Sequence, residues 1–412
     1  MSGGACLVGV VSGLHGVGVV EGLMSRLAGV FEGYGVVYRG VYTGPGGLRR
    51  AVGDCRAVAV LVGSGGTEHV VLEAFEGFGG SVLLLSYGGN NSLAAAVEVL
   101  PALRLRGVRA SLAHLRGDLA RVAGGYAAVV GGVSRFRGAR VGLVGGRPPW
   151  MVYSVVNPES LAGLGVEIVE IPLEELYGRY RGVGEGEARR AAGEYLGFIR
   201  GPLTVEGLVR AVRLHMALEG LVSDYGLDAF TVECFRVIEA LDVSPCLSLA
   251  IHNSRGVVAG CEGDLNGLLG MMAASYVSGE PAFMGNLADL VDERTAVFAH
   301  CTAPLSVGGY TLTTHFESGG PLGVAVEPPV GSVATVLKVD PVRGWFIVSR
   351  GVVLGGGGRP GLCRSQYVVG FEGGVEWMVR DSPGNHYVVV LGDYVERLVL
   401  AGELLGYRVL VR

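Results

Sequence analysis

The sequence contains a single lysine, Lys338, among its 33 basic residues, and only 17% of its residues are charged. Its formal net charge of -5 offers no electrostatic basis for binding nucleic acid, which requires clustered cationic side chains. No apolar run reaches the ~18–20 uncharged residues that a membrane-spanning helix requires. These shortages argue against nucleic acid and membrane as partners.

Paired cysteines are also missing, because none of the seven cysteines belongs to a Cys-x-x-Cys pair. This absence argues against a structural zinc site. An odd number of cysteines scattered among apolar neighbours is typical of reduced core thiols in a cytoplasmic protein. The N-terminal residues lack the basic segment of a signal peptide, and their apolar residues predict a first β-strand. We therefore expect a cytoplasmic protein with free thiols at Cys6, Cys55, Cys234, Cys246, Cys261, Cys301 and Cys363.

Nucleotide-binding motifs are absent as well. The 72 glycines show no G-X-Y period, and they indicate many tight turns between buried strands. The glycine-rich stretches GSGGTEH, YGGNNS and VGGRPPW each follow an apolar run, but none is a GxGxxG or Walker motif. We expect them to supply turns and helix caps, although helix N-termini of this kind also hold anions or sugar hydroxyls.

The order of apolar segments predicts three parts in a chain too long for one core. Residues 1–137 and 138–290 alternate short apolar strands with amphipathic helices, which predicts parallel sheets covered on both faces. Residues 245–253 are among the segments expected to be strands. Residues 291–412 read as alternating β-type sequence with frequent turns and one helix near the end. The predicted fold class is α/β, with two doubly wound Rossmann-like domains followed by a β-rich, barrel-like C-terminal domain.

Two carboxylates, Glu262 and Asp264, follow an apolar strand and precede a helix-forming run. Asp264 stands at the position of a helix N-cap, a common structural use of aspartate. Glu262 lies at the carboxyl end of a predicted parallel strand, where open α/β sheets bind ligands. An unpaired carboxylate there would carry a desolvation cost that a metal ion, a substrate or a salt bridge removes. Glu262 is therefore a candidate metal ligand or catalytic base.

Other polar residues lie at the ends of predicted strands. His300 closes one apolar strand, His386 opens another, and His315 and Glu317 share one strand face. A single histidine is more often a packed, hydrogen-bonded residue than a ligand, but strand ends favour a cleft. One glutamate with histidines and oxygen co-ligands suits a divalent ion such as Mn²⁺. Arg364 lies in an apolar context and requires an anion, a hydroxylated ligand or solvent.

In their order along nearly the whole chain, these segments resemble the L-fucose/L-arabinose isomerase-like superfamily. The resemblance rests on GGTEH with NNSLAAAVEVL, VGLVGGRPPWMV with VEIVEIPLEEL, VECF with SPCLSLA, GCEGDLNGLLGMMAASYVSGEPAFMGN, AHCTAPL, THFESG, CRSQ and GNHYVVVLGD. It implies two Rossmann-like domains, a β-rich domain and a homo-oligomer, either a trimer or a hexamer. It also implies an aldose–ketose isomerase that uses Mn²⁺ or a similar divalent ion.

The resemblance also assigns residues to roles. The family's metal-binding glutamate and C-terminal metal-binding histidine match Glu262 and His386, and His300 resembles a further ligand of the arabinose isomerase branch. The family's second carboxylate matches Asn286, whose amide oxygen can bind a hard cation but cannot take a proton. Either Glu262 then carries the base role alone, or Asp289 substitutes, or the reaction differs. The expected catalytic residues are thus Glu262 and Asn286, which are also metal ligands together with His300 and His386.

The expected activity is the isomerisation of a pentose or hexose through an enediol. Residues expected to recognise sugar hydroxyls are Arg364, His315, Glu317 and Asn385. The alternative is a sugar- or sugar-phosphate-binding protein that keeps the fold without the chemistry, which Asn286 favours. A nucleotide-dependent enzyme is a third option, but no phosphate-binding motif supports it.

Overall fold

The computed structural model describes residues 4–154, 161 and 163–412. The chain divides into two compact units, and each is described by itself. Unit 1 comprises Met1–Gly138, Tyr276–Gly279 and Glu396–Val409, and unit 2 comprises Ala139–Ser275, Glu280–Val395 and Leu410–Arg412. Because unit 2 spans both the predicted second and third parts, this division leaves the boundary near residue 290 a prediction.

Unit 1 is built on a five-stranded parallel sheet with the order β2-β1-β3-β4-β5. Every residue of β1 and β3 is buried, and so is every residue of β4 except the last, as expected for strands with helices on both faces. The strands are β1 Ala5–Val10, β2 Val36–Tyr42, β3 Ala57–Val62, β4 Ser81–Tyr87 and β5 Arg109–Leu115. Strand β5 was not predicted, because arginine, serine and histidine interrupt its apolar residues.

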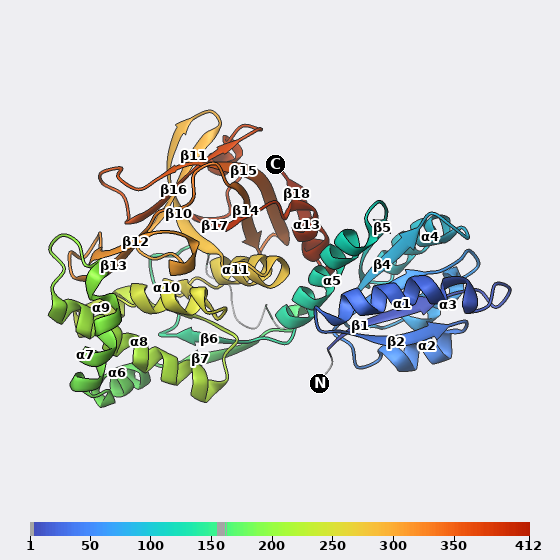
Figure 1. Ribbon diagram of the computed structural model, residues 1–412, viewed down its shortest axis with the longest axis horizontal. Coiled ribbons are helices and arrows are strands. Elements are labelled where there is room, and N and C mark those ends of the chain that lie inside the picture. The colour runs from blue at the N-terminus through green and yellow to red at the C-terminus, as the bar shows by residue number, and fades with distance from the viewer. Residues whose placement is uncertain (1–3, 155–160, 162) are drawn as a thin grey trace. The chain divides into compact units, whose positions relative to one another are not determined.

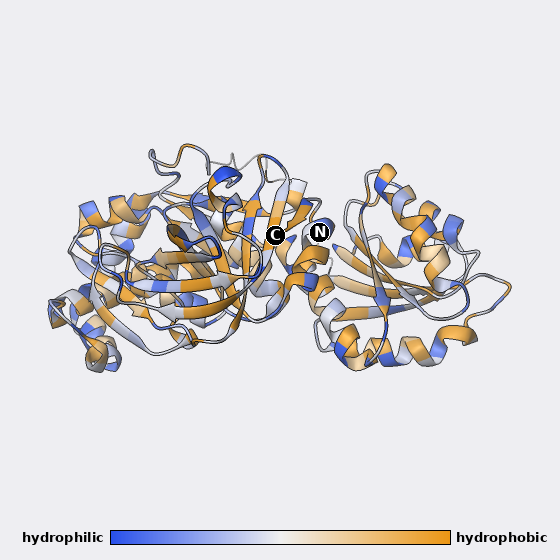
Figure 2. Ribbon diagram, turned by 90° about the horizontal axis from the view of Figure 1, so that it is seen from above, coloured by the Kyte–Doolittle hydropathy of each residue, from blue (hydrophilic) through white to orange (hydrophobic). Residues whose placement is uncertain are grey.

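Two groups of helices pack around this sheet. Helix α1 packs on α5, whereas α3 packs on both α2 and α4. Figure 2 shows the strands of this unit, which are largely hydrophobic, between helices that carry both hydrophobic and hydrophilic residues. The helices are α1 Gly18–Glu32, α2 Pro45–Val52, α3 Glu68–Ala74, α4 Ser92–Leu105 and α5 Leu119–Phe136, and the chain returns to unit 1 in α13, Val395–Leu404.

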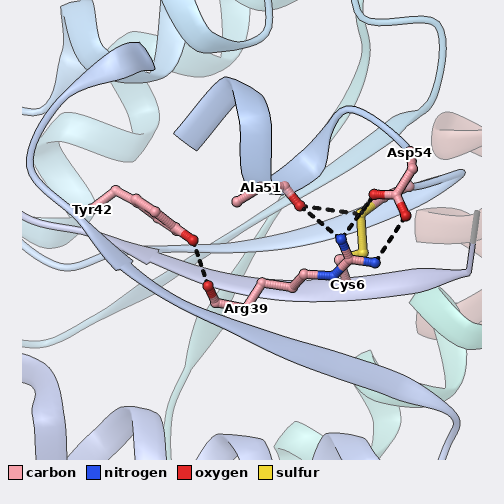
Figure 3. Close-up of a disulfide and its surroundings, with 6 residues drawn as sticks. Cys6, Arg39, Tyr42, Ala51 and Asp54 are labelled. Atoms are coloured by element: carbon pink, nitrogen blue, oxygen red, sulfur yellow. Dashed lines mark hydrogen bonds and ion pairs between the residues drawn. A yellow bond between two sulfur atoms is a disulfide. The ribbon is translucent and has the colours of Figure 1, made fainter. Parts of the chain in front are cut away.

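A disulfide joins Cys6 in β1 to Cys55, two residues before β3, with a Cα–Cα distance of 6.1 Å. The expectation of seven free thiols is therefore wrong for this pair, whereas the other five cysteines are free. The pair was missed because β1 and β3 are neighbours in the sheet although 49 residues separate the two cysteines. Beside it, the guanidinium of Arg39 donates to both carboxylate oxygens of Asp54 (Figure 3). Since disulfides persist mainly in oxidising compartments, the cytoplasmic location stays a prediction.

Unit 2 contains a second parallel sheet, of four strands in the order β7-β6-β8-β9. Its strands are β6 Arg140–Val144, β7 Glu167–Ile171, β8 Ala229–Val232 and β9 Val258–Cys261. Its helices are α6 Leu173–Gly182, α7 Glu185–Ala192, α8 Val205–Tyr225, α9 Cys234–Leu241, α10 Cys246–Ser254 and α11 Leu265–Ser278, whose last three residues fall in unit 1. Two parallel sheets confirm the mixed α/β prediction.

Helix α10 corrects one expectation, because the segment 245–253 was predicted to be a strand. All eight of its residues from Cys246 to Asn253 are buried. Its apolar residues Leu247, Leu249 and Ile251 recur at every second position, which is the period typical of a strand, and the segment is too short for a helical period to be evident.

The C-terminal part of unit 2 is a closed barrel of six strands. Its order is β14-β17-β10-β11-β16-β15, and β14 pairs with β15 to close it, while β18 continues the sheet beyond β15. The barrel strands are β10 Phe283–Asp292, β11 Thr295–His300, β14 Val333–Asp340, β15 Trp345–Gly356, β16 Ser365–Phe371 and β17 His386–Leu391. Figure 1 shows them in orange to red. The prediction of a β-rich, barrel-like part is confirmed.

Smaller elements complete unit 2. They are the hairpin β12 Tyr310–Thr314 and β13 Pro321–Val326 and the short helix α12 Trp377–Arg380. The terminal strand β18 Arg408–Val411 has its first two residues in unit 1 and its last two in unit 2. Helix α12 was not predicted. No helix of the described residues is both long and apolar enough to cross a membrane.

Candidate functional site

Glu262 lies directly after β9, at the carboxyl end of the second parallel sheet. Its backbone has a φ of +60°, a left-handed conformation that costs a residue with a Cβ about 1–2 kcal/mol. Gly263 follows with a φ of +64°, and a Cβ there would lie 2.5 Å from the carbonyl oxygen of Gly146. Only glycine fits this close approach. The chain thus turns sharply at Glu262 and holds its side chain at the edge of the sheet.

Two histidines of the barrel approach this carboxylate. His300 is the last residue of β11, and its Nε2 lies 3.3 Å from Oε1 of Glu262. His386 is the first residue of β17, and its Nε2 lies 3.8 Å from the same oxygen. Strand β10 lies between these two strands, and its Asn286 pairs with His386 on one side and with Ala299, the neighbour of His300, on the other, which brings the two histidines to the same level of the barrel. The structure therefore brings together three of the four residues predicted to bind a metal ion.

These histidines have ring nitrogens that no described residue satisfies. Both ring nitrogens of His300 and Nε2 of His386 are buried without an aligned hydrogen-bond partner in the described part of the chain. Buried polar atoms normally have partners, and an unsatisfied one costs about 1–3 kcal/mol. Imidazole nitrogens beside a carboxylate are donors that a divalent cation could use.

Asp264 fixes the orientation of His386. Its Oδ1 accepts from the backbone N–H of Gly267 at 3.0 Å, so the predicted cap of the following helix is confirmed. Its Oδ2 lies 2.8 Å from Nδ1 of His386, and both side chains are completely buried. A proton on Nδ1 leaves Nε2 as the acceptor or ligand. Sequence reasoning missed this second role, because 122 residues separate the two.

Charge is concentrated in this cluster. Burial by itself would raise the pKa of Glu262, but interaction with the imidazoles of His300 and His386 holds that pKa well below its usual range. Burial would likewise lower the pKa of His386, but Asp264 and Glu262 raise it to about 9. The two imidazoles beside Glu262 therefore favour its anionic form.

Cys261 lies beside the same atoms. Its Sγ, an oxygen of Glu262 and a ring nitrogen of His300 lie within 4.8 Å of one another. The thiol, however, pairs with Cys234, whose Sγ is 3.2 Å away. This hydrogen bond, together with burial, raises the pKa of Cys261 well above its usual value. Because a thiol binds metals as the thiolate, and hard cations prefer oxygen and nitrogen, we assign Cys261 no ligand role.

Asn286, the fourth predicted ligand, lies on β10 directly opposite His386. Its Oδ1 accepts a hydrogen bond of 2.7 Å from Nδ2 of Asn385, which was predicted to bind sugar. Asp289, the suggested substitute for the missing acid, instead pairs with Arg359 at 2.5 Å. An ion pair commits the Asp289 carboxylate elsewhere, so it is a poor candidate for acid–base work.

The remaining predicted sugar-binding residues cluster around the end of β12. His315 is buried, and its Nδ1 lies 3.2 Å from Oγ of Ser318. Nε of Arg364 donates to the carbonyl oxygen of Thr314 at 2.8 Å. Desolvation raises the pKa of Glu317, and the next contribution is the charge of Glu262. The charge of Glu262 thus acts on Glu317.

Sequence reasoning missed two buried ionisable residues near this site. Glu233 follows strand β8 and is completely buried. The same signal that singled out Glu262, an acid directly after an apolar strand, was present in TVEC. Lys338 on β14 donates from Nζ to the carbonyl oxygen of His386 at 2.5 Å, and burial lowers its pKa to about 8. The sequence feature that could have identified Lys338 is that it is a single lysine within an apolar strand.

The sequence is similar to three curated sulfoquinovose isomerases. It is 28% identical to those of Priestia aryabhattai and Priestia megaterium over 200 residues, which cover 47% of this chain and 43% of each relative. It is 26% identical to that of a Clostridium species over 215 residues, or 47% of this chain and 46% of the relative. The chain thus spans about half the length of the curated relatives it matches.

Other comparisons add no argument. No family model matches the sequence. A solved structure described as a putative two-component system response regulator/ggdef domain protein covers 55% of this chain and 82% of its own. Its TM-score of 0.24 and its identity of 13% are too low to carry a conclusion.

Proposed function

We propose that this protein is a metal-dependent aldose–ketose isomerase, similar to the L-fucose/L-arabinose isomerases, that acts on a pentose or hexose through an enediol. The observation that carries the proposal is the convergence of Glu262, His300 and His386 with their unsatisfied ring nitrogens. The similarity to sulfoquinovose isomerases supports the same class of reaction.

The side chains fit a divalent ion, for which Mn²⁺ is the best candidate. Glu262, His300 and His386 offer one oxygen and two nitrogens, and Asn286 lies opposite His386 as a further oxygen donor. Oε1 of Glu262 lies 3.3 Å from Nε2 of His300 and 3.8 Å from Nε2 of His386, so this oxygen and the imidazoles beside it would be the residues that hold the ion. Such an ion polarises the carbonyl of an open-chain sugar as a Lewis acid.

Residues of the chain would transfer the proton, orient the imidazole of His386 and bind the sugar hydroxyls. Glu262 takes the proton from C2 of the aldose and returns it to C1 of the ketose. Asp264 keeps the imidazole of His386 in the tautomer that presents Nε2. The side chains proposed to hold the sugar hydroxyls are Arg364, His315, Glu317 and Asn385.

The test is ketose formation from a panel of pentoses and hexoses that includes sulfoquinovose, with and without EDTA. We expect ketose to form only when the divalent ion is present. Glu262→Gln should lose both activity and Mn²⁺ binding, whereas Glu293→Gln, at an exposed glutamate in the β10–β11 turn, should lose neither. Full activity of Glu262→Gln would refute the proposal.

A second candidate, a sugar- or sugar-phosphate-binding protein, is favoured by Asn286 alone, because this amide cannot transfer a proton. Calorimetric binding of a sugar without turnover would support it. The predicted trimer or hexamer remains a prediction that sedimentation or light scattering can check.

A further inference from the structure

Glu233 occupies on β8 the same position that Glu262 occupies on β9. The two strands are parallel neighbours, and Val232 pairs with Cys261 as the last residue of each. Both glutamates therefore leave the sheet at the same edge, one residue beyond the last paired position. The backbone N–H of Gly263 donates to the carbonyl oxygen of Val232, which ties the two turns together. The topology thus brings two carboxylates to one end of adjacent strands.

Only one of the two oxygens of the Glu233 carboxylate makes a hydrogen bond to the described residues. Its Oε2 accepts from the backbone N–H of Arg236 at 2.9 Å and caps α9. Its Oε1 is buried and has no hydrogen-bond partner among the described residues, although the side chain is completely inaccessible to solvent. Serine, threonine, asparagine or aspartate would supply the same cap without burying a second oxygen. The open oxygen therefore points to a partner outside the protein chain.

The charged surroundings of Glu233 differ from those of Glu262. Desolvation raises the pKa of Glu233; Arg236 on its own helix opposes the rise, and Glu239 and Glu262 add to it. Tyr177 of α6, whose hydroxyl donates to the carbonyl oxygen of Arg236, also faces it. A carboxyl group whose pKa is raised by desolvation and by neighbouring carboxylates holds its proton more readily than a free one, which suits an acid.

We propose that Glu233 is a second acid–base residue of this site, and that its Oε1 exchanges a proton with the sugar oxygens. The inference rests on the proposed isomerase function. It supplies the acid that is missing at Asn286, whose amide cannot give up a proton, and at Asp289, which is paired with Arg359. This acid follows β8 of the parallel sheet, whereas Asn286 and Asp289 lie on β10 of the barrel.

The proton transfers balance with these two residues. In the first half, ionised Glu262 takes the hydrogen of C2 as a proton, a double bond forms between C1 and C2, and protonated Glu233 gives its proton to O1. The product is the neutral enediol. In the second half, Glu233 takes the proton of the O2 hydroxyl, C2=O2 forms, and Glu262 returns its proton to C1. The ketose leaves, and both residues recover their starting states.

The experiment compares Glu233→Gln with Glu239→Gln in the full-length protein loaded with Mn²⁺. Glutamine keeps an acceptor for the cap at Arg236 but cannot transfer a proton, and Glu239 is an exposed glutamate on the same helix. We expect Glu233→Gln to lower kcat by about 10²- to 10⁴-fold with little change in KM, the usual contribution of general acid–base catalysis. Its Mn²⁺ affinity and Tm should stay close to those of Glu239→Gln.

A second measurement does not depend on turnover. Because the proposed transfer requires Glu233 to hold a proton in the resting protein, the infrared carbonyl band of a buried carboxyl group should be present in the wild type and absent from Glu233→Gln. If no such band is lost, the assignment is overturned. A kcat above a tenth of the wild-type value, or an equal loss of Mn²⁺ affinity and activity, would also overturn it. If the wild type forms no ketose from any sugar, the proposed function itself fails, and the assignment fails with it.

Discussion

The contact between Asp264 and His386 gives the sharpest prediction. Asp264 bonds through one oxygen to the N–H of Gly267 and through the other to Nδ1 of His386, and neither side chain of this buried pair is exposed. Asparagine has one acceptor oxygen and can satisfy only one of these donors. In Asp264→Asn, either the cap or the imidazole therefore faces an amide N–H, and the ligand histidine loses its fixed orientation.

The magnitude follows from the chemistry of that bond. Replacing the outer partner of a metal-binding histidine typically weakens metal binding by about 10- to 100-fold, which corresponds to about 1.4–2.7 kcal/mol. We expect the Kd for Mn²⁺ to rise by that factor in Asp264→Asn, measured by isothermal titration calorimetry. The apo variant should also lose about 1–3 kcal/mol of stability, because one buried donor is left unsatisfied.

Asp340→Asn is the matched control. Asp340 is also completely buried, and it accepts from the backbone N–H of Val342 and from the hydroxyl of Tyr153 and pairs with Arg343. None of its partners among the described residues is a candidate ligand. This variant should lose stability and keep its Mn²⁺ affinity. A Kd for Asp264→Asn within twofold of the wild type would refute the reasoning. An equal loss of affinity in both variants would do the same, because it would show a general effect of disturbed packing.

Three further predictions concern stability. Burial, with His252 and Arg255 nearby, lowers the pKa of His215 to about 3, so the unfolded chain binds a proton that the folded protein does not. The contribution of His215 to the unfolding free energy should thus be fully present above pH ~6.5 and decrease by up to about 1.4 kcal/mol per pH unit as the pH drops towards 3. Urea titrations of His215→Asn should show a shallower decrease with pH, and a pH dependence equal to that of the wild type would contradict the assignment. Reduction of Cys6–Cys55 should lower the unfolding free energy by about 2–4 kcal/mol, with Cys55→Ala insensitive to reductant; free thiols at both positions by mass spectrometry would disprove the bond. Gly263→Ala should cost at least about 1–2 kcal/mol, because its φ is +64° and its Cβ would meet a carbonyl oxygen; a Tm equal to that of the wild type would rule out this strain.

Local patterns were sufficient for much of the fold and for the outline of the site. Strands β3 and β4 were predicted correctly from their runs of apolar residues, whereas the segment 245–253, in which large apolar residues recur at every second position, was misread as a strand and forms α10. Glu262, His300 and His386 were selected individually because each polar residue terminates or begins an apolar strand. That rule depends only on the neighbours of each residue in the chain.

Pairings between distant segments needed the structure. The disulfide between Cys6 and Cys55 and the bond between Asp264 and His386 join residues that are far apart in the sequence. The same holds for the pairing of Val232 with Cys261, which brings Glu233 beside Glu262. No local pattern encodes which strands become neighbours.

The sequence by itself determined the periodicity of the strands, the cap at Asp264 and the chemical types of the candidate ligands, because these depend on the properties of adjacent residues. Only the tertiary structure decided that Asp264 also orients His386, that Asp289 is committed to Arg359, and that Glu233 keeps one oxygen open. Hydrogen bonds and ion pairs act over about 3 Å. Which polar atoms come within that distance is decided when the sheets and the barrel pack, and the same packing sets the burial that moves their pKa values.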